Sequence, residues 1–334
     1  MIRNRVASPR IDRRLLFGGA AATAAAALGE GEWAAAVTPA AVPAASQNAD
    51  QSTFYRTIDI DGLRIFYREA GDPENPTILL LHGFPSSSHM FRGLIPLLAD
   101  RFHLIAPDYP GFGHSDAPAA DEFDYTFDHL ADVMEGFVDA VGLGSYSLYV
   151  QDYGAPVGFR LATRRPDQIE SLIVQNGNAY EEGFTDFARP ALVAFGESPR
   201  TAESEQPLRD ILTLEATIFL YTEGVRDPAR LSPDAWSVDQ YFLNRPGNDE
   251  IQLALFHDYL SNVRLYPEWH AYFRERQPPT LVVWGQNDPI FGAPGAEAFR
   301  GDLPDAEIHL LDTGHFALED QAGVIAGHIG RFLG

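Results

Sequence analysis

One segment constrains the fold of this chain more than any other, the run Ser147-Leu-Tyr-Val-Gln-Asp152-Tyr-Gly-Ala-Pro-Val-Gly158. The apolar residues before Asp152 predict a buried strand, and the small residues after it permit an abrupt turn into a helix that packs closely on that strand. Such a turn, a nucleophile elbow, leaves its central side chain exposed at the edge of a sheet. The segment therefore predicts that Asp152 is available for chemistry.

An aspartate at this position predicts a different reaction from the serine that many hydrolases carry there. A serine attacks a carbonyl carbon and forms an acyl ester, whereas a carboxylate displaces a leaving group from carbon and becomes part of an alkyl ester. We therefore expect an enzyme that forms a covalent alkyl ester on Asp152.

Strand and helix patterns alternate on both sides of the elbow. The predicted strands are residues 53–60, 63–69, 77–81, 103–106, 145–150, 171–175, 280–284 and 307–311. The predicted helices cover about residues 90–99, 125–141 and 153–165. The first two strands meet at Asp61-Gly62 and are expected to be antiparallel. The others, joined by helices and short turns, predict an α/β fold with a doubly wound, mostly parallel sheet.

The alternation stops between residues 180 and 274. This segment is helical and aromatic in pattern, contains scattered prolines and shows no strand alternation. An all-helical cap subdomain inserted between two strands is the simplest interpretation, and it would lie over the strand ends. The predicted core then consists of residues 46–179 and 275–334.

The first 45 residues read as a leader. Arg13-Arg14-Leu15-Leu16-Phe17 precedes an apolar run of Gly and Ala to about Leu28, and possible cleavage points follow Ala36 or Ala44. This pattern is typical of a twin-arginine export signal. The alternatives are an Ala-rich extension or a membrane anchor, but the apolar run is too short to span a bilayer stably. We expect a periplasmic or secreted protein without a membrane span in its mature form.

Composition excludes several functions. All 24 basic residues are arginine, five of them in the leader, and the net charge is −23. Nucleic-acid binding is therefore not expected, because phosphate contacts need a basic face. The absence of cysteine excludes disulfides, thiol catalysis and thiolate metal sites.

The turn after the strand 77–81 offers a second part of a site. Leu80-Leu81-His82-Gly83-Phe84-Pro85 closes that strand with a turn able to present a backbone N–H. We expect the N–H groups of Phe84 and Tyr153 to form an oxyanion hole, which stabilises charge on an ester oxygen during hydrolysis. His82 itself is expected to be structural.

An acid and a histidine follow the last two predicted strands. Asp288 lies in Gly285-Gln-Asn-Asp288-Pro-Ile, and His315 lies in Leu311-Asp-Thr-Gly-His315-Phe. Both loops fall on the carboxyl side of the sheet, where such folds bind ligands. Their order and placement predict a triad in which Asp288 orients His315 as the base that serves Asp152.

The chain after the leader resembles an α/β-hydrolase of the group that contains epoxide hydrolases and haloalkane dehalogenases. Besides the triad it shares Ala106-Pro-Asp-Tyr-Pro-Gly-Phe-Gly-His-Ser-Asp116, a loop found in this group after the fourth strand. The resemblance implies an α/β-hydrolase fold and a reaction without cofactor or metal. In that reaction Asp152 attacks carbon, and His315, held by Asp288, activates a water that cleaves the alkyl ester.

Two alternatives compete with parts of this triad. Gly113-His114-Ser115-Asp116-Ala117 resembles a serine elbow, but Pro118 and the acidic residues after it break the helix that such an elbow needs. Glu181 or Glu182 follows the sixth strand, where some resembling dehalogenases place the orienting acid. Asp288 fits its own loop better.

Epoxide opening needs an acid for the departing oxygen, which lid tyrosines supply in the resembling epoxide hydrolases. Tyr259 lies where the second of those tyrosines is expected. The first has no clear counterpart, and Tyr221 and Tyr241 are candidates for it. Packing within the cap is the competing interpretation for each of them.

Halide release needs N–H donors that hold an anion. The resembling dehalogenases carry Trp after the nucleophile and Asn after the His-Gly pair, or Trp in the lid. Here the first two positions are Tyr153 and Phe84, and Tyr153 departs from the Trp that is usual in both groups. Trp236 and Trp269 remain as lid candidates. Phe84 matches the epoxide-hydrolase form of the loop, which favours epoxide hydrolysis over haloalkane hydrolysis.

The expected partners are a small apolar organic substrate, an epoxide or a haloalkane, and water. A third interpretation is a ligand-binding or sensor protein that keeps the fold without catalysis. A complete triad and an export signal argue against it.

Overall fold

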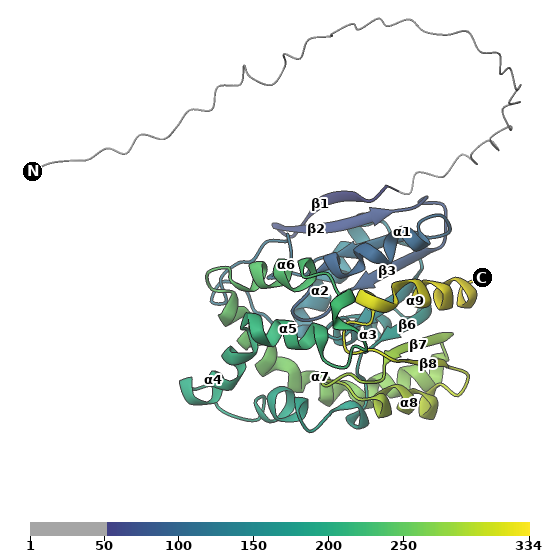
Figure 1. The fold of residues 1–334 in the computed structure, drawn as a ribbon. Helices are drawn as coiled ribbons and strands as arrows, with labels where there is room; N and C mark the ends of the chain where they lie inside the picture. The colour runs from purple at the N-terminus through teal and green to yellow at the C-terminus, as the bar shows by residue number, and fades with distance from the viewer. Residues whose placement is uncertain (1–51) are drawn as a thin grey trace, which may run out of the picture. The chain divides into compact units, whose positions relative to one another are not determined.

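A computed structural model describes residues 52–334, and the predicted export leader lies outside the described residues. The described part of the chain folds around an eight-stranded sheet in the order β1-β2-β4-β3-β5-β6-β7-β8 (Figure 1). β2 runs antiparallel to both β1 and β4, and every other neighbouring pair is parallel. Helices flank this sheet, which gives the expected mostly parallel α/β architecture.

The strands lie close to their predicted positions. They are β1 (Phe54–Ile60), β2 (Leu63–Ala70), β3 (Thr77–Leu81), β4 (His103–Pro107), β5 (Tyr146–Gln151), β6 (Ile169–Gln175), β7 (Thr280–Gly285) and β8 (Glu307–Leu311). All residues of β4, β5 and β7 are buried, which explains why their sequences are mostly apolar on both faces of the sheet.

The core helices are α1 (Ile95–Leu98), α2 (Phe127–Val141), α3 (Gly154–Arg164), α8 (Ala293–Asp302) and α9 (Leu318–Phe332). The helix predicted over residues 90–99 is wrong in detail. The structure has a 3₁₀ helix over Ser88–Gly93 followed by the short α1. Pro96 explains the break, because a proline inside a helix removes a backbone donor and clashes with the preceding turn.

The segment between β6 and β7 is helical from Glu181 to Arg276. Its α-helices are α4 (Ala202–Ile211), α5 (Leu214–Thr222), α6 (Asp234–Leu243) and α7 (Asn248–Arg276). We call this segment the cap. The long helix α7 leads from the cap back to the core (Figure 1).

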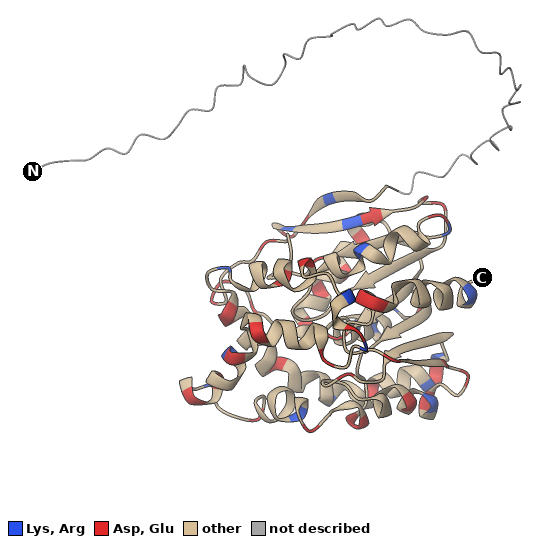
Figure 2. Ribbon diagram, viewed as in Figure 1, with Lys and Arg blue, Asp and Glu red and all other residues tan. Residues whose placement is uncertain are grey.

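Charged residues of both signs are spread over the helices, with acidic positions predominating (Figure 2). Within residues 52–334 no helix combines the length and apolar character needed to cross a membrane.

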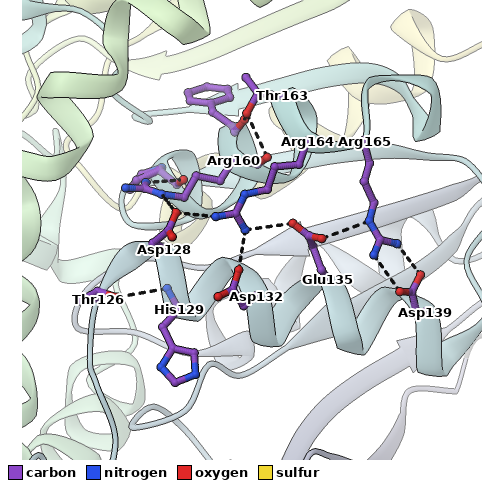
Figure 3. A network of polar contacts seen from close by, with 12 residues as sticks. Thr126, Asp128, His129, Asp132, Glu135, Asp139, Arg160, Thr163, Arg164 and Arg165 are labelled. Atoms are coloured by element: carbon purple, nitrogen blue, oxygen red, sulfur yellow. Dashed lines mark hydrogen bonds and ion pairs between the residues drawn. The ribbon is translucent and has the colours of Figure 1, made fainter.

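Ion pairs join α2 and α3 along their length (Figure 3). Arg164 and Arg165 of α3 pair with acidic side chains of α2, namely Asp128, Asp132, Glu135 and Asp139. Most of these carboxylates are exposed to solvent, so each pair contributes little to stability.

Arg160, on the same helix, is different because its side chain is almost fully buried. It donates hydrogen bonds to Asn262 Oδ1 at 2.7 Å and to Ser261 Oγ at 3.1 Å, both on α7. These bonds tie the helix that follows the elbow to the longest helix of the cap.

We expect Arg160→Ala to lower the free energy of unfolding by about 3 kcal/mol, because it strips a buried Asn262 oxygen of a charged donor and leaves a void. Arg164→Ala is the matched control on the same helix and should cost less than about 1 kcal/mol. Urea unfolding of both variants measures the difference. Equal losses would contradict a special role for Arg160 in holding the cap.

Candidate active site

The turn after β5 places Asp152 in a backbone conformation that few non-glycine residues adopt, with φ of 49°. The turn is tight because α3 begins directly against β3. A Cβ atom on Gly154 would lie 2.2 Å from the Leu81 carbonyl oxygen, so only glycine fits there. The side chain of Asp152 is thereby held at the carboxyl end of the sheet.

Two backbone N–H groups bind the Asp152 carboxylate. The N–H of Phe84 donates to Oδ1 at 2.6 Å, and the N–H of Tyr153 is a second donor to the carboxylate. These are the two donors that the sequence predicted for an oxyanion hole. The close approach depends on Gly83, where a Cβ would lie 2.3 Å from the Cβ of Asp152.

His315 lies between the two acids of the predicted triad. Its Nδ1 is 2.8 Å from Asp288 Oδ2, and its Nε2 is 3.8 Å from Asp152 Oδ2. All three side chains are buried. The structure thus brings together Asp152, His315 and Asp288 from the turns after β5, β8 and β7.

Further bonds orient Asp288. Asn176 donates from Nδ2 to Asp288 Oδ2 at 2.7 Å, and the N–H of Ile290 donates to Oδ1 at 2.7 Å. The side-chain Oδ1 of Asn176 also accepts the N–H of Gly285, and the backbone carbonyl of Asn176 accepts the N–H of Asp152. One residue at the end of β6 therefore connects the nucleophile turn to the acid loop.

The Gln151 side chain contacts the other nitrogen of the imidazole, with 3.0 Å between its Nε2 and His315 Nε2. An amide N–H at that position needs a lone pair on Nε2. The proton of a neutral His315 then sits on Nδ1 and is donated to Asp288. This is the tautomer that a general base requires.

Burial and charge shift the pKa values of the reacting groups. Burial raises the pKa of Asp152, although His315 and the two backbone N–H donors partly offset the rise. Burial alone would lower the pKa of His315, but the carboxylate of Asp288, its hydrogen bond and Asp152 outweigh it and raise that pKa. The protonation state of Asp152 consequently depends on that of His315, and the reverse.

Asp152 and His315 open onto a pocket between the core and the cap. Apart from these two residues and Tyr153, its lining is apolar: Phe84, Phe187, Ala188, Ala191, Leu192, Ile211, Ala216, Phe219, Leu220, Phe256 and Ile290. The rings of Phe187 and Phe219 lie 5.8 Å apart and are the exposed members of this lining. The pocket suits a small apolar molecule.

The predicted lid tyrosines do not line this pocket. Tyr259 is buried behind Tyr153, and its hydroxyl is hydrogen-bonded to that of Tyr266. Tyr241 points to solvent, with 72% of its surface exposed. Tyr259 and Tyr241 lie on sides of the cap helices that do not face the pocket, which explains both positions.

Tyr221, the remaining tyrosine candidate, stacks on Phe316 at 4.0 Å and donates its hydroxyl hydrogen bond to Asp239. The lid tryptophans are also absent from the pocket lining. Trp236 packs beside Tyr221, and Trp269 is buried against Phe159 on the far side of α3.

The other residues singled out in the sequence lie elsewhere. His82 is fully buried and accepts the N–H of Tyr109 at Nε2, and burial lowers its pKa to about 4, so it is a neutral structural residue. Ser115 donates to the Asp108 carbonyl and accepts the N–H of Phe66. Glu181 and Glu182 are exposed and do not contact His315.

Sequence reasoning missed Asn176, Gln151 and the apolar walls of the pocket. Asn176 had a signal, because it follows a buried strand directly and asparagine tolerates the left-handed backbone that it adopts here, with φ of 44°. Gln151 had a weaker one, as a polar residue ending an apolar strand next to the nucleophile. The apolar walls of the pocket come from cap helices, and no feature of the sequence indicated which residues would form them.

One cluster of possible metal ligands exists in the described part of the chain, formed by Glu307, His309 and His328 on β8 and α9. It lies at the edge of the sheet and shares no residue with the pocket.

The profile of the alpha/beta hydrolase fold matches residues 76–322. The chain belongs to the α/β-hydrolase family. This α/β-hydrolase has relatives over most of its length. An uncharacterised hydrolase of Saccharomyces cerevisiae is 44% identical, with 80% of this chain and 93% of the relative covered. A haloalkane dehalogenase of Psychrobacter cryohalolentis is 38% identical, with 81% and 88% covered.

Solved structures agree on the fold. Cfl2 from Burkholderia cenocepacia superposes with a TM-score of 0.70 at 22% identity, covering 84% of this chain and 95% of that one. The haloalkane dehalogenase DbeA from Bradyrhizobium elkani gives 0.65 at 24% identity, covering 84% and 99%. The predicted fold class and the resemblance to the dehalogenase-containing group are confirmed, and the family is one of hydrolases.

The buried Asp239 provides a test of the cap contact beside His315. Burial raises the pKa of Asp239 to about 8, although the hydrogen bond from Tyr221 opposes the rise. The folded state thus holds a proton that the unfolded chain releases above pH about 4. Stability from this group is complete below that pH and is lost as the pH rises through about 8.

We therefore expect Asp239→Asn to flatten the fall in unfolding free energy between pH 5 and 8, by up to about 1.4 kcal/mol per pH unit. The amide carbonyl can still accept the Tyr221 hydroxyl. Asp234→Asn, an exposed acid on the same helix, is the control and should leave the profile unchanged. Parallel profiles for wild type and Asp239→Asn would show that the carboxyl is charged when folded.

Proposed function

We propose that this hydrolase cleaves a bond between carbon and a leaving group in a small apolar substrate, through a covalent alkyl ester on Asp152. The observation that carries the proposal is the state of the Asp152 carboxylate. Its Oδ1 is bound by the N–H of Phe84, while Oδ2 lies beside His315 at the base of an apolar pocket. A desolvated carboxylate oxygen facing such a pocket is a strong nucleophile toward carbon.

In the first half-reaction Oδ2 of Asp152 attacks the substrate carbon and the leaving group departs with the bonding electrons. Oδ1 stays bound to the N–H of Phe84 and becomes the carbonyl oxygen of the ester. That donor, with the N–H of Tyr153 beside the same carboxylate, is then in place to stabilise negative charge when water attacks the ester carbon.

In the second half-reaction Nε2 of His315 exchanges its hydrogen bond from the Gln151 amide for one from that water, and then takes a proton from the water. Asp288 accepts the Nδ1–H bond at 2.8 Å and stabilises the imidazolium that forms. The water oxygen adds to the carboxyl carbon of Asp152, and the bond from that carbon to Oδ2 breaks. Oδ2 leaves in the alcohol and takes the second proton of the water, which regenerates the carboxylate, and the imidazolium then releases the first proton to solvent. Neither half-reaction calls on a cofactor.

For the leaving group, we propose an epoxide oxygen first and a halide second. Epoxide hydrolysis is favoured because Phe84 has the form typical of epoxide hydrolases, and because none of the residues lining the pocket is a tryptophan able to hold a halide. Haloalkane hydrolysis is favoured by the relatives of 38% and 31% identity that are named haloalkane dehalogenases. The alternative from another functional class is a ligand-binding or sensor protein that has this fold but no catalytic activity.

Trapping the ester tests the mechanism. His315→Gln removes the base but leaves Asp152 free to react, so we expect a stable adduct after incubation with a panel of 1,2-epoxyalkanes and 1-haloalkanes. Intact mass and peptide mapping should place one adduct on Asp152. The double variant Asp152→Asn/His315→Gln should form none. Binding without any adduct, or an adduct on Ser115, would refute the proposal.

The two half-reactions should respond differently to pH. Ester formation needs ionised Asp152 and ester hydrolysis needs neutral His315, and both pKa values are raised in the free enzyme. Acid therefore slows both steps. In the ester the charge of Asp152 is gone, and with it one of the interactions that raise the pKa of His315.

We expect rapid-quench kinetics to show ester hydrolysis persisting to a lower pH than the His315 pKa of the free enzyme, measured by NMR. Hydrolysis that fails at or above that pKa would mean that the Asp152 charge does not act on His315.

A further inference from the structure

We infer that the hydroxyl of Tyr153 is the donor to the departing oxygen, and that the substrate is accordingly an epoxide rather than a haloalkane. The inference rests on the proposed function, because it names the group that acts on the leaving atom in that reaction. It moves the acid from the cap, where the sequence placed it, to the residue that follows the nucleophile.

The composition of the pocket narrows the choice of donor. Of the side chains that line it, only Asp152, Tyr153 and His315 carry a polar group. Asp152 is the nucleophile, and the N–H of neutral His315 faces Asp288. Tyr153 is the one lining side chain left that can donate a hydrogen bond to a leaving group.

The cap hydroxyls are already committed elsewhere. Tyr259 is bonded to Tyr266, whose oxygen also accepts a bond from Asn178. Tyr221 is bonded to Asp239, and Tyr241 lies at the surface. To serve the pocket, either of the two buried tyrosines would have to break a hydrogen bond in a desolvated interior.

The Tyr153 hydroxyl is in the opposite situation. The side chain is 99% buried, and its oxygen has no hydrogen-bond partner within residues 52–334. Its neighbours are mostly phenylalanine rings, among them Phe84 and Phe127 at 5.8 and 4.8 Å between centroids. A buried hydroxyl without a partner destabilises the fold. A ligand oxygen in the pocket would supply the missing partner.

The chemistry of a buried phenol suits an oxygen leaving group. Burial and the charge of Asp152 raise the pKa of Tyr153 well above its usual value, so the phenol stays protonated at neutral pH and acts only as a donor. An epoxide oxygen becomes a basic alkoxide as its bond to carbon breaks, and gains much from that donor. A halide is a weak acceptor and gains little.

The proton balance is complete. Asp152 Oδ2 forms a bond to one epoxide carbon, the bond from that carbon to the ring oxygen breaks, and the ring oxygen takes the electron pair and the Tyr153 proton. Water then cleaves the ester while His315 takes its proton, which returns to the phenolate through solvent. The net reaction adds one water to the epoxide and yields a diol.

The chain offers a matched control in Tyr109. Its hydroxyl is also fully buried, without a partner in the described part of the chain and within reach of the Asp152 charge, yet Tyr109 does not line the pocket. Replacing either tyrosine by phenylalanine removes an unsatisfied oxygen and leaves the packing intact. Both variants should therefore unfold at the wild-type temperature or above it.

The experiment measures single-turnover ester formation in the His315→Gln background with a 1,2-epoxyalkane and a 1-bromoalkane of equal chain length. Adding Tyr153→Phe should slow the epoxide reaction by about 100-fold or more and change any bromoalkane reaction by less than about threefold. Adding Tyr109→Phe should change neither.

Tyr153→Trp, which replaces the phenol O–H by an indole N–H that is a weaker acid and a halide donor, should shift the ratio of the two rates toward the bromoalkane by at least about tenfold. This readout does not depend on the phenylalanine variant.

The outcomes separate this inference from the proposed function. Adducts on Asp152 that form from the epoxide at the same rate with and without Tyr153→Phe would overturn the role of Tyr153 and leave the covalent mechanism standing. Adducts from the bromoalkane alone would overturn the epoxide assignment. No adduct from either substrate in the His315→Gln parent would overturn the proposed function itself.

Discussion

The site depends on a single constraint, the left-handed backbone at Asp152. That conformation turns the chain from β5 into α3 within two residues and leaves the carboxylate pointing along the end of the sheet. It is held in place from both sides, because Gly154 lets α3 meet β3 and Gly83 lets the neighbouring turn meet Asp152. Strain of this kind persists only where the surroundings over-determine it, and here the fully buried strands do so.

The charged and polar groups around that turn depend on one another. Asp152 and Asp288 lie on opposite sides of one imidazole, so two buried carboxylates share one positive charge when His315 is protonated. Asn176 contacts the backbone of Asp152, the backbone of Gly285 and the carboxylate of Asp288. A change in any one loop would therefore move the others, which explains why the polar residues at the strand ends form a continuous network rather than separate pairs.

Sequence reasoning located the parts of this site that the sheet determines. Asp152 follows β5 directly, and Asp288 and His315 lie in the loops that follow β7 and β8. Parallel strands bring their carboxyl ends to one edge whatever the helices between them do. The cap is different. Successive residues on a helix point about 100° apart, so the position of Tyr259 on α7 could not show that its hydroxyl would meet Tyr266 rather than the pocket. Pro96 was a clear local signal that the helix predicted over residues 90–99 would be broken. The apolar residues around Pro96 favoured a continuous helix and concealed that signal.

Residues 151–153 contain the destabilising features of the site: two buried polar atoms without a partner in the described part of the chain and one strained backbone. Gln151 has a buried carbonyl oxygen without a partner among the described residues, Asp152 has a strained backbone, and Tyr153 has a buried hydroxyl in the same condition. Three consecutive residues that each reduce stability are tolerated because β5 is fully buried and paired with a strand on each side. Of the two unsatisfied side chains, only Tyr153 lines the pocket. A molecule bound there can therefore give a partner to the Tyr153 hydroxyl, which is why the proposed role of this residue depends on an oxygen in the substrate.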